Sequence, residues 1–143
     1  MEHKTINFDY LIGVKGFSEK LLKDHFTLYA GYVKKLNEIE TKLKTIDKSA
    51  PNYSFNEFSE LKRREAVAFN GAYLHEMYFE NMSKETTSVG SETKEMAEQA
   101  FGSWENFIKD IRATASSTPG WVLVTYNKID KQLHTYIMFE HHI

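Results

Sequence analysis

The sequence contains no cysteine, only two prolines and no long apolar run. The absence of cysteine excludes disulfides, thiolate metal sites and cysteine nucleophiles together. No apolar stretch approaches the roughly 20 residues that a membrane span requires, so we expect no membrane partner. Neither sign of charge dominates, because 18 lysines and arginines stand against 20 acidic residues, and we expect no nucleic-acid partner. We expect a cytoplasmic protein.

The first half of the chain carries a strong helical pattern. Apolar residues recur at helical spacing over about residues 18–47, with Ser18 as a candidate N-cap. A second stretch of this kind covers about residues 56–82. We therefore predict a helical hairpin as a first domain, residues 1–85, which begins with an irregular arm over residues 1–15.

The pattern changes after a polar connector. A third helical stretch is interrupted near Gly102. Aromatic and β-branched residues then predict two strands, over residues 121–126 and 133–141, around a turn. Because two strands alone make a marginal sheet, we predict that residues 86–143 form a partial α+β domain.

Two histidines are the leading functional candidates. His25 and His75 each fall on an apolar face of a predicted helix, and small residues precede His75 by one turn. At about 100° per residue, His25, Tyr29 and Tyr32 share one stripe of their helix. A metal site would use such a pair, but a lone histidine on an apolar face is more often a packing residue. The spacing does not decide between these interpretations.

Four stretches resemble the iron/manganese superoxide dismutase family. They read H-F-T-L-Y-A-G-Y-V-K-K-L-N in the first helix, A-Y-L-H-E-M-Y-F in the second, F-G-S-W-E-N-F after the connector and P-G-W-V-L-V-T-Y-N-K in the first strand. The resemblance covers most of the chain but only about the first two-thirds of a family member. It implies an α+β fold, with an N-terminal helical hairpin followed by a domain of helices and a three-stranded antiparallel sheet that is truncated here.

The resemblance also implies a function. His25 and His75 would be the first two of four ligands to iron or manganese (Fe or Mn), and Tyr32 would line the substrate entrance. His141 would take the outer-sphere position that hydrogen-bonds to solvent. The protein would be a metal-dependent superoxide dismutase that converts superoxide to oxygen and hydrogen peroxide. The alternative is a non-catalytic α+β scaffold or interaction domain derived from that fold.

The sequence departs from the family pattern in two respects. Tyr32 follows His25 by seven residues, whereas family members commonly use eight. Seven residues are nearly two helical turns, so both side chains can share one helix face. The Asp-x-Trp-x-His segment that supplies the remaining two ligands does not occur in the sequence. We therefore expect a chain that is shortened at its C-terminus.

Two other pairs of residues are alternatives for the missing ligands. Asp130 and His134 reproduce the aspartate-to-histidine spacing, but they lie at a predicted turn and lack the tryptophan. Glu140 and His142 are a second possibility, because alternate residues of a strand share one face. His141, which lies between them, would then point to the opposite face.

The second predicted strand also suggests self-association. Four apolar residues follow one another from Tyr136 to Phe139 and leave the strand without a polar face. An apolar edge of this kind favours strand addition. We expect a homo-oligomer, such as a dimer, with superoxide as its small-molecule substrate.

Overall fold

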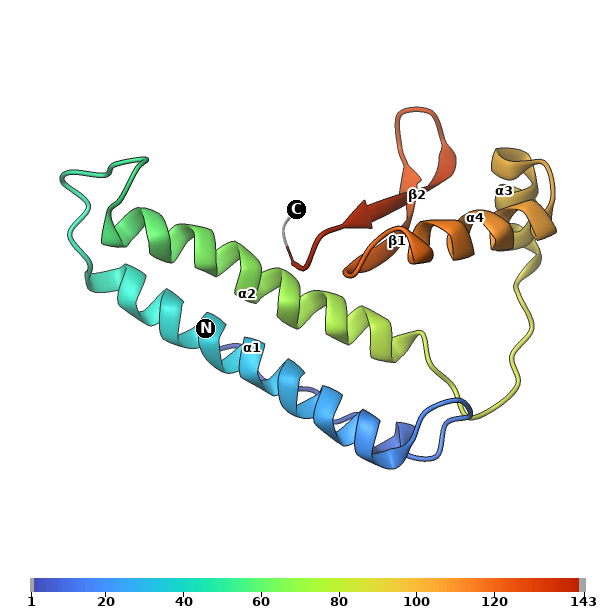
Figure 1. Cartoon of the computed structure of the whole chain (residues 1–143), viewed down its shortest axis with the longest axis horizontal. Helices are drawn as coiled ribbons and strands as arrows, with labels where there is room; N and C mark the ends of the chain where they lie inside the picture. Colours follow the sequence, from blue (N-terminus) through green and yellow to red (C-terminus); the bar gives the residue numbers. More distant parts are fainter. Residues whose placement is uncertain (1, 142–143) are drawn as a thin grey trace. The chain divides into compact units, whose positions relative to one another are not determined.

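The computed structural model describes residues 2–141 of the chain. The chain divides into two compact units, residues 1–86 and 87–143, and each has its own buried apolar cluster. The first unit is helical and the second combines helices with a small sheet (Figure 1), which confirms the α+β class. No helix in the described range is both long and apolar enough to cross a membrane.

The first unit is a hairpin of two long helices that lie side by side (Figure 1). Helix α1 covers Glu19–Thr45 and helix α2 covers Glu57–Glu80, within two residues of the predicted ranges. Ser18 is the predicted N-cap, since its hydroxyl accepts a hydrogen bond from the backbone N–H of Leu21 at 3.1 Å. Asn56 caps α2 in the same way. Such caps satisfy N–H groups that lack partners in the first helical turn.

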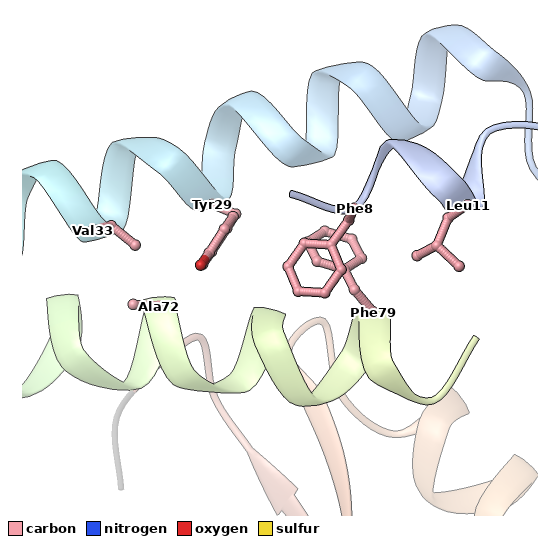
Figure 2. Close-up of a cluster of buried hydrophobic side chains, with 6 residues drawn as sticks. All are labelled: Phe8, Leu11, Tyr29, Val33, Ala72 and Phe79. Carbon is pink, nitrogen blue, oxygen red and sulfur yellow. The ribbon is translucent and has the colours of Figure 1, made fainter. Parts of the chain in front are cut away.

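The core of the hairpin lies between the facing surfaces of α1 and α2, as Figure 2 shows. Its buried side chains are Phe8, Leu11, Tyr29, Val33, Ala72 and Phe79. Phe8 and Leu11 come from the N-terminal segment, which turns through the short 3-10 helix η1 at Asp9–Leu11. The sequence predicted only an irregular arm here, because the apolar residues of this segment do not recur at helical spacing and nothing in their pattern singles out Phe8 and Leu11. Burial of Phe8 and of Leu11 each contributes about 1.5–3 kcal/mol to the free energy of unfolding.

Two short helices open the second unit. Helix α3 covers Ser91–Phe101 and helix α4 covers Trp104–Ser116, so the predicted break near Gly102 is confirmed. Gly102 adopts a φ of 83°, and its N–H donates to the carbonyl oxygen of Glu98 at 2.8 Å. Glycine adopts this left-handed conformation without steric cost, and it therefore ends α3 here.

The two predicted strands form an antiparallel pair around the predicted turn. Strand β1 covers Trp121–Asn127, strand β2 covers Gln132–Met138, and the two pair over their full length. The prediction that the second strand continues to His141 is wrong. Glu140 adopts a φ of 51°, which takes the backbone out of the extended conformation. Residues 2–141 thus contain two of the three strands that the resemblance predicts.

One face of the strand pair packs against α3 and α4. Leu133, which lies opposite Tyr126 in the register, is buried with Ala97 and Phe107. The hydroxyl of Thr135 also donates to the carboxylate of Asp110 on α4. Several apolar side chains of the pair and of the residue after β2 are 40–63% exposed, namely Val124, Tyr126, Tyr136, Ile137 and Phe139.

We expect Gly102→Ala to lower the free energy of unfolding by about 1 kcal/mol, because alanine adopts a left-handed conformation only with strain. Space is not the limit, since an added Cβ would lie 3.8 Å from the nearest atom, the side-chain nitrogen of Asn106. Gly102→Asn is the matched control, because asparagine tolerates this conformation better. Thermal unfolding followed by circular dichroism should rank wild type, Gly102→Asn and Gly102→Ala in that order. Equal stability of all three would contradict the expectation.

Candidate metal centre

His25 on α1 and His75 on α2 meet across the interface of the hairpin. Their ring centroids lie 4.8 Å apart, and the ring planes are inclined at 87°. Two imidazoles bound to one metal through bonds of about 2.1 Å, at a bond angle of about 90–110°, have centroids about 4.6–5.3 Å apart. The separation of the two rings therefore fits a shared metal ion.

A backbone hydrogen bond orients the ring of His75. Its Nδ1 lies 2.5 Å from the carbonyl oxygen of Gly71, one turn earlier in α2. A carbonyl oxygen can only accept, so Nδ1 carries the proton and Nε2 carries the lone pair. Metal-ligating histidines commonly use this arrangement, in which the second ring nitrogen donates to the protein.

Burial lowers the pKa of both imidazoles below the usual 6.5. For His25, which is partly buried, loss of solvent is the larger cause, and the charge of a protonated His75 adds to it. For His75, which is 2% exposed, loss of solvent lowers the pKa and the hydrogen bond to Gly71 opposes part of the shift. Both rings are therefore neutral at pH 7, the form in which histidine binds metal.

The ring of Tyr32, on α1, packs on the ring of His75. It stacks on His75 with centroids 5.5 Å apart and planes inclined at 30°. The ring also covers Gly71, where an added Cβ would lie only 2.5–2.8 Å from its carbon atoms. The small residue one turn before His75 thus permits a close approach of the two helices.

Two further aromatic rings from α2 pack on His25. Tyr78 lies 5.4 Å away and Phe79 lies 5.2 Å away, measured between ring centroids. Burial in this cluster also raises the pKa of Tyr78. An aromatic surround of this kind limits access of water and lowers the local polarity around a bound ion.

A hydrogen-bonded pair beside the histidines was missed from the sequence. The hydroxyl of Tyr29 donates to the carboxylate of Glu76 at 2.7 Å and accepts the backbone N–H of Ile6 at 3.0 Å. Burial, together with the bond to Glu76, raises the pKa of Tyr29 to about 12. The available signals were the position of Tyr29 one turn after His25 and that of Glu76 next to His75.

The remaining candidates lie in the second unit. The Nδ1 of His141 accepts a hydrogen bond from the indole N–H of Trp121 at 3.1 Å. Asp130 and His134 form an exposed pair with each other at 2.8 Å, beside the turn between the strands. His142 lies outside the described residues.

The donor set within residues 2–141 is partial. No three histidine, cysteine, aspartate or glutamate side chains of this range lie close enough together to hold a metal ion. Neutral imidazoles suit iron and related metals as nitrogen donors, but a catalytic metal site typically has at least three protein ligands. The hairpin can therefore supply two donors to a larger set.

Known proteins resemble the chain over most of its length, although no family model matches it. It is 37% identical to the iron superoxide dismutase of Cupriavidus metallidurans over 123 residues, and 32% identical to the iron superoxide dismutase of Aquifex pyrophilus over 129 residues. It is also 31% identical to the manganese superoxide dismutase of Haloarcula marismortui over 145 aligned positions, which cover 98% of the chain and 68% of that protein.

The chain belongs to the iron/manganese superoxide dismutase family. The alignments with the two iron enzymes cover 82% and 85% of the chain, but only 60% and 61% of those proteins. The chain thus spans about three-fifths of the length of these curated relatives.

We expect Gly71→Ala to lower the free energy of unfolding by about 1–3 kcal/mol, because the new methyl group would overlap the ring of Tyr32. Gly31→Ala on α1 is the matched control. An added Cβ meets no atom within 4 Å there, and alanine in an exposed helix interior should stabilise by up to about 1 kcal/mol. Urea unfolding should give the two variants opposite signs. A fully stable Gly71→Ala would show that the helices are not in close contact at this point.

We expect the metal-free chain to lose stability as the pH falls below 6.5. Because the pKa values of His25 and His75 are lowered in the folded chain, the unfolded chain binds more protons in this range. Their contribution is complete above pH 6.5 and is lost as the pH falls through the folded pKa values. An NMR titration of the histidine ring protons should place both midpoints below 6.5.

The double variant His25→Gln, His75→Gln separates this effect from that of other groups. Its free energy of unfolding should fall less than that of the wild type between pH of about 7.5 and 5.5. Parallel losses in the two proteins would show that other groups cause the pH dependence.

Proposed function

We propose that the chain carries the metal-binding helical hairpin of an iron- or manganese-dependent superoxide dismutase, with His25 and His75 as two of its metal ligands. The observation that carries the proposal is the buried contact of two neutral imidazoles, one from each helix of the hairpin. Membership of the family and the names of its iron and manganese relatives support the choice of metal.

The residues of the hairpin have distinct roles in this proposal. A bound iron or manganese ion would supply the redox chemistry, in which one superoxide is oxidised to oxygen and another is reduced to hydrogen peroxide. His25 and His75 provide neutral nitrogen donors, and the hydrogen bond to Gly71 holds the ring of His75 in position. Tyr32, stacked on that ring, lines the approach of the substrate.

The second unit has a supporting role in the proposal. His141, held by the indole of Trp121, would supply the outer-sphere hydrogen bond that the family uses at this position. The two ligands that residues 2–141 lack would come from a segment of the Asp-x-Trp-x-His kind that the family resemblance implies. The proposed domains are residues 1–85 and 86–143.

The protein also self-associates in this proposal. Apolar side chains of the strand pair remain exposed, Tyr136 and Ile137 among them, and such a surface favours a homo-oligomer, with a dimer as the simplest form. A cytoplasmic location is compatible with the absence of cysteine, and we propose it for this protein.

Metal content tests the ligand assignment. After anaerobic equilibration with iron(II) or manganese(II) and removal of free metal, we expect up to one ion per wild-type chain. His25→Ala and His75→Ala should each lose this ion, because a single imidazole is a weak site. His3→Ala is the control, since His3 lies on the exposed N-terminal arm and bonds to Glu40. Circular dichroism should show that all variants remain helical.

The decay of superoxide tests the activity. The loaded 143-residue chain should accelerate this decay less than a complete relative does, because its described residues bring only two metal ligands together. The effect should disappear in His75→Ala and persist in His3→Ala. Metal content and superoxide decay that do not depend on His25 or His75 would overturn the proposal.

A further inference from the structure

The hydroxyl of Tyr29 joins three segments of the hairpin unit. It donates to the carboxylate of Glu76 on α2, and it accepts the backbone N–H of Ile6 in the N-terminal segment. Tyr29 itself belongs to α1 and is 2% exposed. In Figure 2 its hydroxyl lies in the space between the two helices. A buried phenol with both a donor and an acceptor partner is a fixed point in the interface.

This fixed point lies beside the histidine pair. Tyr29 follows His25 by one helical turn, and Glu76 directly follows His75. The bond of 2.7 Å therefore joins the two helical turns that carry the imidazoles. The ring of Tyr29 also lies 6.5 Å from that of His75, between centroids.

The N-terminal segment is anchored at a second point on α1. The backbone N–H and carbonyl of His3 form reciprocal hydrogen bonds of 2.9 Å with the side chain of Asn37. Between His3 and the buried Phe8, the N–H of Ile6 reaches Tyr29. The hydroxyl of Tyr29 thus has the N-terminal segment as its hydrogen-bond donor and Glu76 as its acceptor.

A phenylalanine would fill the same space as Tyr29 but would leave its two partners unsatisfied. The helices could then shift relative to each other at small cost, because apolar packing alone is less specific in geometry than a hydrogen bond. A shift of a few tenths of an ångström is enough to misplace two ligands that must meet one ion.

We propose that Tyr29 and Glu76 are positioning residues that hold the rings of His25 and His75 at the separation needed to bind one metal ion. The inference rests on the proposed metal-binding function of that histidine pair. Neither residue touches the metal in this assignment, and each acts through the helical turn that carries a histidine. The N-terminal segment is the third member of the arrangement, through Ile6.

Cobalt(II) is the probe for this proposal, because its visible spectrum reports ligand geometry and its titration gives an affinity. Tyr29→Phe and Glu76→Ala should each weaken cobalt(II) binding about tenfold or more, as loss of supporting contacts does at other metal sites. Glu76→Gln retains an oxygen acceptor for the phenol and should keep most of the affinity. Tyr73→Phe, which removes a hydroxyl from an exposed ring of α2, should bind as the wild type does.

A second control separates positioning from general loss of stability. Ser18→Ala removes the N-cap of α1 and should lower the melting temperature while leaving the cobalt(II) affinity and spectrum unchanged. A Ser18→Ala variant that is as unstable as Tyr29→Phe and loses as much affinity would reduce the effect to stability and overturn the proposal.

The metal-free chain gives an independent readout. NMR of the ring nitrogens of His75 should show one tautomer, with the proton on Nδ1, in the wild type and in Tyr73→Phe. The signals should shift or broaden in Tyr29→Phe. A wild-type chain that binds no cobalt(II) would overturn the metal-binding function, and the NMR comparison would still decide the role of Tyr29. Unchanged His75 signals and unchanged affinity in Tyr29→Phe would overturn the positioning role alone.

Discussion

The close contact between α1 and α2 at Gly71 is the constraint on which the first unit depends. Because Gly71 has no side chain, the ring of Tyr32 lies where a Cβ would otherwise be. The helices can therefore approach until the rings of His25 and His75 lie 4.8 Å apart. The carbonyl of Gly71 also accepts the Nδ1 proton of His75. One residue thus sets both the helix separation and the orientation of the buried histidine.

Buried polar atoms are tolerated in this apolar interface because they have hydrogen-bond partners. Each unsatisfied buried imidazole or phenol would lower the free energy of unfolding by on the order of 1–3 kcal/mol. Within residues 2–141, no buried side-chain nitrogen or oxygen lacks a hydrogen-bond partner. Apolar residues would pack a simple hairpin with less need for such matching. The neutral imidazoles inside an aromatic cluster are instead what a metal site requires, since a metal ion displaces no proton from them.

The periodicity of the chain predicted the helices and their ends well, because caps and breaks are local. Ser18 and Gly102 act within one helical turn, and their residue types alone indicate what they do. The end of β2 was mispredicted because it carries no such local signal. The apolar pattern continues past Met138, and the residue type of Glu140 does not indicate a positive φ.

The sequence by itself determined the helical hairpin, the strand pair, the family and the two histidines as candidates. Only the tertiary structure decided that Phe8 and Leu11 enter the core, that Tyr32 stacks on His75 and that Tyr29 bonds to Glu76. Periodicity shows which face of one helix is apolar, but it does not show which residue of another segment lies opposite. That choice depends on the crossing and register of the helices, which follow from how all their side chains pack together.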